Sequence, residues 1–333
     1  MYLGGNMKNK IIRVAIVGYG NLGKGVESII NNTMDMELIC IITRRNPSEI
    51  KVQSSVPVIN EKDMEKWKDK IDIAILCGGS AKDLLIQGPQ YARLFNTVDA
   101  FDIHQKALEY IAVMDNITKE SNKIAVACVG WDPGLFSTMR FLIKAILPAS
   151  KAYTFWGYGV SQGHSDAIRN IEGVKNAMQY TVPIEGALQN IRDGKTPNFT
   201  KREMHKRICF VSVNEWADKN KIEQEIKNMP YYFDEYETIV NFMDDEELIK
   251  NHSALSHGGT VIGVDNTNGI KQVMEFKLNL NSNPLFTAAI LIAYTRATYK
   301  MHQEGIRGCK TFADVAPKYL TNSGYDEIIT QFL

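Results

Sequence analysis

The chain has 333 residues, of which 44% are hydrophobic, and this is enough for two domains with buried cores. Its 38 Lys and Arg residues balance 38 Asp and Glu residues. A formal charge of zero gives no overall field that would draw the protein to nucleic acid or to an anionic membrane, so a small, locally recognised ligand fits better.

The cysteines and the chain start favour a cytoplasmic protein. None of the five cysteines belongs to a C-x-x-C pair, and most lie in apolar runs, where a reduced thiol packs as a small hydrophobic group. The first ten residues, "MYLGGNMKNK", lack the apolar core of a secretory signal, and Met7 is an alternative start. The longest apolar stretch, "FTAAILIAYTRATY", is interrupted by Thr and Arg, so we expect no membrane span.

Between Ile11 and Ser137, apolar runs alternate with stretches of helix length. These runs are "IIRVAIV", "LICIIT", "IDIAILC", "NTVDAF" and "KIAVACV". Runs that are apolar on both faces are typical of a parallel sheet covered by helices on both sides. The sequence therefore predicts an α/β, Rossmann-type doubly wound domain over residues 1–135.

The first run leads directly into glycines spaced G-x-G-x-x-G, at Gly18, Gly20 and Gly23, and "LGKGVESIINN" continues with helical spacing. A dinucleotide site needs such a strand, a tight turn with bare backbone, and a helix N-terminus that faces the pyrophosphate. The pattern predicts a dinucleotide site, and a glycine turn without a ligand is the alternative.

The end of the second run indicates which dinucleotide is bound. NAD-binding proteins usually place Asp or Glu here, on the ribose hydroxyls, whereas this strand ends in Thr43, Arg44 and Arg45. Two guanidinium groups with no repelling carboxylate would pair with a 2′-phosphate, which predicts NADP. Two solvated loop arginines are the alternative.

The third run ends in "ILCGGSAKD". The small residues Gly78 and Gly79 would let the nicotinamide side of a cofactor approach the backbone, and Ser80 is a candidate helix cap. An ordinary turn between strand and helix would show the same residues, so this stretch only supports the cofactor prediction.

Two acids end the next runs, Asp102 in "NTVDAFDIH" and Asp132 in "ACVGWDPG". If both strands belong to the parallel sheet, both carboxylates face the nicotinamide crevice, where they would hold an amine. The alternatives are that Asp132 caps a helix, and that Asp99 and Asp102 are solvated turn residues.

Beyond about residue 150 the pattern changes to period-two alternation, in "AYTFWGYGV", "KRICFVSV", "YETIVNFM", "GTVIGV" and "KQVMEFKLNL". This predicts antiparallel strands and a second, α+β domain over residues 136–283. A long helix should follow, with Asn283 as N-cap, Pro284 at its first position and Gly305 beyond its end.

The second domain offers groups that bind a carboxylate: Thr181, Arg207 and His257. An Arg can hold a carboxylate with two bonds, while Thr and His add donors. A surface arginine or a satisfied histidine is the alternative for each. The sequence contains no H-E-x-x-H or Cys/His cluster, so no metal is expected, and no G-x-S-x-G nucleophile.

Together these pieces resemble the meso-diaminopimelate dehydrogenase family. The resemblance rests on "VAIVGYGNLG", the Arg pair, "GWDPG", "TFWG", "SQGHSDA", "MHKR", "HGG" and "NPLFTA", in the family's order over nearly the whole chain. Two departures are Thr43, where Ser is common, and Phe101, where Tyr is frequent.

The resemblance implies reversible, NADP-dependent oxidative deamination of the D-centre of meso-2,6-diaminopimelate to L-2-amino-6-oxopimelate and ammonia. It also implies a homodimer formed by the middle domain, and a C-terminal segment, residues 284–333, that packs on the dinucleotide-binding domain. The cofactor residues that it implies are Gly18, Tyr19, Gly20, Asn21, Leu22, Gly23, Thr43, Arg44, Arg45, Cys77, Gly78, Gly79, Ser80, Ala100, Phe101, Asp102, Gly130, Trp131, Asp132, Pro133 and Gly134. The substrate residues that it implies are Asp102, Asp132, Trp156, Gln162, Gly163, Thr181, Arg207, His257 and Asn283.

Among these residues, Asp132 is the expected base or proton relay and Asp102 the second contact to the amine. Arg207, with Thr181 and His257, is expected to hold the distal carboxylate. Two other readings are a dehydrogenase or reductase like homoserine dehydrogenase or dihydrodipicolinate reductase, and a non-catalytic regulator that binds NADP.

Overall fold

The computed structural model describes residues 10–252 and 254–333, so the alternative start at Met7 lies outside the described residues. The described chain divides into two compact units. The first contains the residues up to Thr138 together with Pro284–Leu333, and the second is Met139–Asn283.

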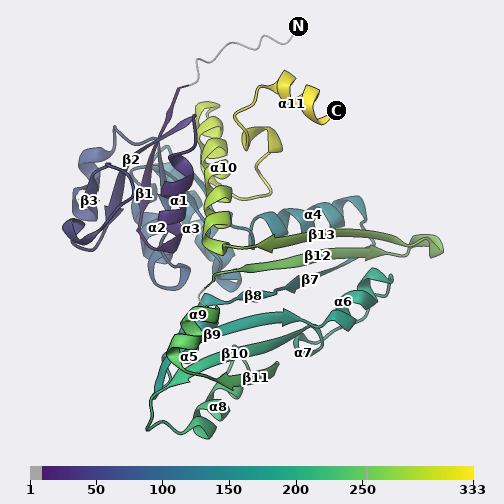
Figure 1. The fold of residues 1–333 in the computed structure, drawn as a ribbon. Coiled ribbons are helices and arrows are strands. Elements are labelled where there is room, and N and C mark those ends of the chain that lie inside the picture. The colour runs from purple at the N-terminus through teal and green to yellow at the C-terminus, as the bar shows by residue number, and fades with distance from the viewer. Residues whose placement is uncertain (1–9, 253) are drawn as a thin grey trace. The chain divides into compact units, whose positions relative to one another are not determined.

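A parallel seven-stranded sheet forms the first unit, in the order β14-β6-β5-β4-β1-β2-β3 (Figure 1). Its strands are β1 (Ile12–Val17), β2 (Met36–Thr43), β3 (Val58–Asn60), β4 (Ile73–Leu76), β5 (Asn96–Asp99), β6 (Ile124–Val126) and β14 (Gly308–Lys310). Its helices are α1 (Asn21–Ile30), α2 (Leu85–Ala92), α3 (Ala107–Glu120), α10 (Asn283–Gln303) and α11 (Tyr325–Phe332), and α4 (Leu135–Ile146) begins in this unit. The Rossmann-type prediction is confirmed.

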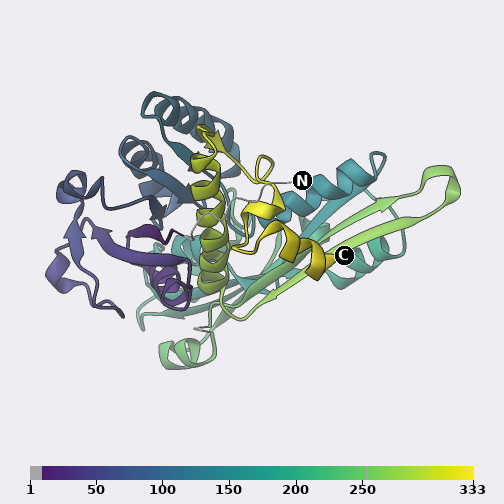
Figure 2. The ribbon, with the colours of Figure 1, turned by 90° about the horizontal axis from the view of Figure 1, so that it is seen from above.

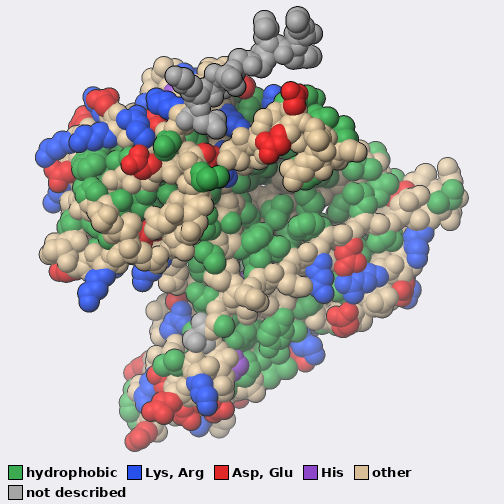
Figure 3. Space-filling view, turned by 45° about the horizontal axis from the view of Figure 1, so that its top comes forward, with side chains coloured by type: hydrophobic (Ala, Val, Ile, Leu, Met, Phe, Trp, Pro, Cys, Tyr) green, Lys and Arg blue, Asp and Glu red, His purple; other side chains and the backbone are tan. Residues whose placement is uncertain are grey.

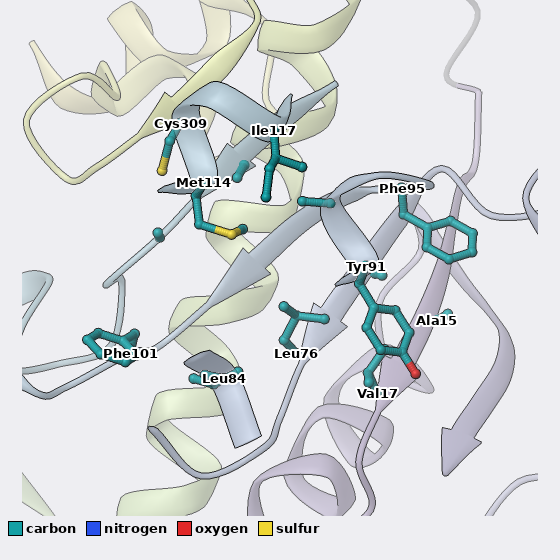
Figure 4. Close-up of a cluster of buried hydrophobic side chains, with 14 of the residues drawn as sticks. Ala15, Val17, Leu76, Leu84, Tyr91, Phe95, Phe101, Met114, Ile117 and Cys309 are labelled. Carbon is teal, nitrogen blue, oxygen red and sulfur yellow. The ribbon is translucent and has the colours of Figure 1, made fainter. Parts of the chain in front are cut away.

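Helices cover both faces of this sheet because its strands are apolar on both faces. Ala15 and Val17 of β1 point to one face, where they pack with residues of α2 and α3 (Figure 4). Val14 and Ile16 point to the other face, toward α1 and α10. The helices α1 and α10 lie side by side in two views (Figures 1 and 2). They approach closely because α1 has Gly25 at the crossing, where an added Cβ would lie 3.2 Å from the Cβ of Ala288.

The strand order reverses direction between β1 and β4. In such sheets ligands bind beyond the carboxyl ends of the strands at this switch point. The glycine loop follows β1, the Arg pair follows β2 and the residues Cys77–Gly79 follow β4, so the sheet gathers them at one edge.

Two smaller sheets form the second unit, one ordered β11-β10-β9-β8 and one ordered β13-β12-β7. The strands are β7 (Lys151–Trp156), β8 (Gly159–Val160), β9 (Val174–Pro183), β10 (His205–Val213), β11 (Glu237–Phe242), β12 (His257–Asp265) and β13 (Gln272–Leu280). The helices are α5 (Gln162–Arg169), α6 (Glu185–Arg192), α7 (Lys201–Met204), α8 (Lys219–Lys227) and α9 (Asp245–His252). The α+β prediction is confirmed.

Two local predictions need correction. The second unit is not wholly antiparallel, because β11 pairs in parallel with β10. The long connection through α8 returns the chain to the same end of the sheet, as a parallel pair requires. The helix α10 begins at Asn283 itself, one residue before the predicted start, while Gly305 follows its end with a φ of +83°.

Surface charge follows the balanced composition. On the face shown in Figure 3, basic and acidic side chains are interspersed. Across residues 10–252 and 254–333, no helix combines the length and apolar character that a membrane crossing requires.

Candidate active site

The three glycines after β1 meet three different requirements. Gly18 has a φ of +88°, which side chains rarely adopt. A Cβ at Gly23 would collide with the carbonyl oxygen of Gly18, so this glycine lets α1 pack against the loop. A Cβ at Gly20 would meet nothing within 4 Å, so its bare backbone faces open space. The loop thus has the tight turn, the close helix packing and the exposed backbone that a pyrophosphate site needs.

The N-terminus of α1 suits an anion. Gly20 is its N-cap, no side chain caps the helix, and the first turn contains no acidic residue. The helix dipole and the first N–H groups are therefore available to a ligand. Asn21 and Leu22 begin this helix, so the structure places both at the predicted position.

Tyr19 is held from beneath the loop by a buried carboxylate. Its hydroxyl donates to Glu27 of α1, which also accepts the backbone N–H of Ser54 at 2.9 Å. Burial and the bond to Glu27 raise the pKa of Tyr19 to about 12. Tyr19 is buried, and its ring is part of the support of the loop.

The Arg pair after β2 lies at the same pocket, of about 330 Å³, as the glycine loop and Cys77–Gly79. Arg45 donates to the carbonyl oxygen of Tyr19 at 3.0 Å, and its N–H donates to the hydroxyl of Thr43 at 3.1 Å. Arg44 forms an ion pair with Asp83. The prediction that no carboxylate accompanies the arginines was wrong, because Asp83 and Glu61 also line the pocket.

Ser80 has a different role from the predicted helix cap. It is the first residue of a π-helical turn, Ser80–Leu84, whose N-cap is Gly79. The hydroxyl of Ser80 accepts the backbone N–H of Asp102 at 3.1 Å, and Asp83 accepts that of Gly79 at 2.9 Å. Ser80 thereby connects the segment after β4 to the segment after β5.

The segments that carry the two predicted acids lie next to each other. A Cβ added at Gly130 would lie 3.4 Å from the Cβ of Ala100, within ordinary contact distance. Asp102 is exposed and Asp132 is half-buried, so neither acid is enclosed in the core. The residue before Asp102 is buried, in contrast to Asp102 itself. The ring of Phe101 stacks on the ring of Tyr110, with the ring centres 4.3 Å apart. The Phe101 side chain therefore packs in the core.

Asp132 is not the residue that directly precedes the helix α4. Residues 131–133 form a turn that is closed by a bridge between Gly130 and Gly134, and α4 begins only at Leu135. The ring of Trp131 packs edge-on against Phe136 at 5.1 Å, which anchors the turn in the core. Pro133 follows a cis peptide bond.

Asp99 is not a solvated turn residue. It ends β5, is fully buried, and its carboxylate accepts from the N–H groups of Phe101 and Cys128 and from the hydroxyl of Tyr110. Burial raises the pKa of Asp99 to about 6, and the hydrogen bonds oppose this rise.

This burial predicts a pH-dependent stability. An acid whose pKa is higher in the folded than in the unfolded state stabilises the fold when protonated, and this contribution is lost as pH rises from about 4 through about 6. Asp99→Asn cannot titrate, so we expect its free energy of unfolding, relative to the wild type, to rise by about 3 kcal/mol over this interval. Urea unfolding at pH 4, 5, 6 and 7 checks this, and a difference that stays flat or falls would contradict it.

Arg207 and Thr181 meet in the second unit. They are directly opposite each other on the antiparallel strands β10 and β9, and the guanidinium donates to the Thr181 hydroxyl. Arg207 is 7% exposed and Thr181 is 4% exposed. The predicted pair is therefore brought together on one face of the sheet.

The Arg207 guanidinium is a buried cation, and the described residues do not use all of its hydrogen-bond donors. Its carbon lies 3.9 Å from the centre of the Tyr236 ring, and its Nε is buried without a hydrogen-bond partner among the described residues. Burial lowers the pKa of Arg207, and a buried cation is costly unless an anion compensates it. Burial, together with the nearby Arg207, lowers the pKa of His164 to about 3, so this histidine is neutral at pH 7.

His257 and Trp156 lie close to this pair in the second unit. Gly159 pairs with Thr181, and a Cβ at Gly159 would collide with the His257 ring. Trp156 is exposed, and its ring lies 5.4 Å from that of His205.

The remaining predicted substrate residues lie at the starts of two helices, α5 and α10. Gln162 and Gly163 are exposed at the start of α5, directly after β8. The N–H of Asn283 donates to the carbonyl oxygen of Leu255 at 2.8 Å, just before His257. Sequence reasoning missed Tyr236 and the individual role of His164. The motif "SQGHSDA" contains His164 and was a usable signal, whereas nothing around Tyr236 marks it.

Comparison with known proteins agrees with this geometry. Residues 130–282 match the family model of the diaminopimelic acid dehydrogenase C-terminal domain. A meso-diaminopimelate D-dehydrogenase from Ureibacillus thermosphaericus is 52% identical over 305 residues, which are 91% of this chain and 94% of the relative.

Two solved structures are also similar. The diaminopimelate dehydrogenase of Corynebacterium glutamicum in complex with DAP has a TM-score of 0.91 and 41% identity, and the match covers 97% of this chain and 99% of the other. An engineered D-amino acid dehydrogenase bound to NADP⁺ has a TM-score of 0.87 and 40% identity, covering 97% and 100%.

Proposed function

The chain belongs to the meso-diaminopimelate dehydrogenase family, and from this membership we propose that it reversibly deaminates the D-centre of meso-2,6-diaminopimelate, with NADP⁺ as the hydride acceptor. The products are L-2-amino-6-oxopimelate and ammonia. The observation that carries the substrate assignment is the buried Arg207, whose unpartnered Nε and bond to Thr181 make it a receptor for a carboxylate.

The acids of the first unit supply the chemistry at the amine. Hydride leaves the α-carbon only after the bound ammonium has lost a proton, since the nitrogen lone pair must be available. Asp132 accepts this proton, directly or through water, and Asp102 is the second contact to the amine. The bound nicotinamide supplies the redox chemistry. Water then adds to the iminium carbon of the substrate, and ammonia departs.

The carboxylate receptor decides which end of the substrate reacts. The two ends of meso-diaminopimelate differ only in configuration. Arg207, with Thr181 and His257, holds the carboxylate of the L-centre and leaves the D-centre to the acids. Trp156, Gln162, Gly163 and Asn283 complete the substrate contacts.

The residues at the pocket of the first unit fit NADP⁺. Gly18–Gly23 and the N-terminus of α1 accommodate the pyrophosphate, and Thr43–Arg45 the 2′-phosphate. Arg44 is half-exposed, so a phosphate has access to it. The segments Cys77–Ser80, Ala100–Asp102 and Gly130–Gly134 complete the cofactor contacts.

Removing Arg44 tests the cofactor assignment. We expect Arg44→Ala to lower the affinity for NADP⁺ by about tenfold to a hundredfold, because the charged hydrogen bond to the 2′-phosphate is lost. The affinity for NAD⁺ should change by less than about threefold. Fluorescence titration of both dinucleotides measures this. Equal affinities of the wild type for the two, with no effect of the substitution, would contradict it.

Exposed apolar side chains of the second unit support a homodimer. These side chains include Phe141, Leu142 and Ile146 of α4 and Val273 of β13, and a broad hydrophobic area lies beside the β12–β13 hairpin (Figure 3). We expect light scattering after size exclusion to give twice the mass of the chain, and Leu142→Asp to shift the mass toward one copy. A wild-type mass of one chain would contradict the dimer.

The five free cysteines support a location in the reducing cytoplasm.

One assay tests the reaction against the two other readings. NADPH formation is followed by absorbance with the meso, LL and DD isomers of diaminopimelate. We expect turnover of the meso isomer and none of the LL isomer, which has no D-centre. A regulator would bind NADP⁺ without turnover, and a different dehydrogenase would leave the meso isomer unchanged.

A further inference from the structure

Asp99 is a buried acid outside the machinery described above. It is the last residue of β5, its exposure is 0%, and it lies between the neighbouring strands β4 and β6 of the sheet. A buried carboxylate is retained at a cost in desolvation unless other groups compensate it. What it contacts therefore indicates what it does.

Its carboxylate joins the two segments that carry the predicted acids. One oxygen, Oδ1, accepts the N–H of Phe101 at 3.0 Å and that of Cys128 at 3.2 Å. The carbonyl oxygen of Asp99 accepts the N–H of Val129 at 3.0 Å. One residue thus binds the backbone directly before Asp102 and the backbone leading to Asp132.

The orientation of the carboxylate is fixed from α3. Its second oxygen accepts the hydroxyl of Tyr110 at 2.9 Å, and the Tyr110 ring stacks on Phe101. The bond to Cys128 stabilises an unusual backbone conformation. Cys128 has a φ of +60°, in the left-handed region that non-glycine residues rarely adopt. Asp99 holds the chain at the point where it turns toward Gly130.

We propose that Asp99 is a positioning residue, whose carboxylate holds the Ala100–Asp102 and Cys128–Gly134 segments in the register that presents Asp102 and Asp132 to the substrate amine. This inference rests on the proposed function. Asp99 itself touches neither substrate nor cofactor. It acts through the backbone of two segments, and small displacements of reacting groups lower rates strongly.

Two near-isosteric substitutions separate geometry from charge. In Asp99→Asn the amide oxygen still accepts both N–H groups, and the amide nitrogen donates to the Tyr110 oxygen. Asp99→Leu removes every acceptor. We expect Asp99→Asn to keep kcat within about threefold and Asp99→Leu to lower kcat by about a hundredfold. NADP⁺ affinity should change far less than kcat in both, because the glycine loop and the Arg pair, which hold the pyrophosphate and the 2′-phosphate, follow other strands.

The kcat of each variant is taken per NADP⁺-binding site, so that a loss of folded protein is not counted as a loss of catalysis. A folded Asp99→Leu variant with wild-type kcat would overturn the inference. So would an Asp99→Asn variant that loses as much kcat as Asp99→Leu, since charge rather than hydrogen-bond geometry would then matter.

A second variant keeps the test decisive if Asp99→Leu does not fold. Tyr110→Phe retains the stacked ring and removes only the bond that orients the carboxylate. We expect several-fold lower kcat with a smaller change in NADP⁺ affinity, and an unchanged kcat would overturn the inference. The wild type is assayed alongside with meso-diaminopimelate. If the wild type shows no turnover, the proposed function is wrong. If the wild type and Asp99→Leu are equally active, only the role of Asp99 is wrong.

Discussion

Asp132→Asn should lower kcat for meso-diaminopimelate by about a hundredfold to ten-thousandfold, the usual range for loss of a general base. The amide has nearly the shape of the carboxylate but cannot accept the ammonium proton, so the amine keeps no lone pair to expel hydride. NADP⁺ affinity should change far less than kcat, because the glycine loop and the Arg pair, which hold the pyrophosphate and the 2′-phosphate, are untouched. Steady-state kinetics with both substrates varied measures kcat and each KM separately.

The matched control is Asp63→Asn. Asp63 is a half-exposed acid of the same unit that pairs with Lys66 on the surface. Surface ion pairs of this kind contribute little to stability. We expect this variant to keep wild-type kcat. If Asp132→Asn retained wild-type kcat/KM, the assignment of the base would be wrong.

Arg207→Met should mainly raise KM for diaminopimelate. Loss of one charged, desolvated contact costs about 2 to 5 kcal/mol, which corresponds to a factor of roughly 30 to several thousand in kcat/KM. The methionine fills similar volume beside Tyr236, so the strands should keep their pairing. The acids remain in place, and saturating substrate should therefore recover much of kcat.

Arg202→Met provides the control for Arg207→Met. Arg202 is exposed on α7, and among the described residues its guanidinium donates only to the backbone oxygen of Tyr236, at 3.2 Å. Its loss should leave KM within about twofold, as is usual for surface substitutions. An Arg207→Met variant with unchanged KM would show that the substrate carboxylate is held elsewhere.

Period and composition were sufficient for the sheet of the first unit. Residues such as Val14 and Ala15 are both apolar although they face opposite sides, which indicates a strand buried on both faces. The glycine loop was readable because each glycine has a local cause. The strand β14 was not predicted, since three residues near the chain end carry no periodic signal and their pairing with β6 is long-range.

The partners of the site residues depended on contacts that local sequence does not encode. Asp83 is 39 residues from Arg44, so the carboxylate beside the Arg pair came from another strand end. Asp99 follows an apolar run just as a solvated turn acid does, and only the approach of Cys128 and Tyr110 shows that it is buried. Tyr236 reaches Arg207 through the unexpected parallel pairing of β11 with β10.

In the proposed reaction Asp102 and Asp132 bind the D-centre amine of the substrate, and Arg207 binds its L-centre carboxylate. A crystal structure of the enzyme with NADP⁺ and meso-diaminopimelate tests it most directly. We expect a carboxylate oxygen of Asp102 or Asp132 within about 3 Å of the D-centre nitrogen, and the Arg207 guanidinium at about the same distance from the L-centre carboxylate. A complex in which both acids point away from the D-centre nitrogen, or in which Arg207 binds no substrate carboxylate, would contradict it.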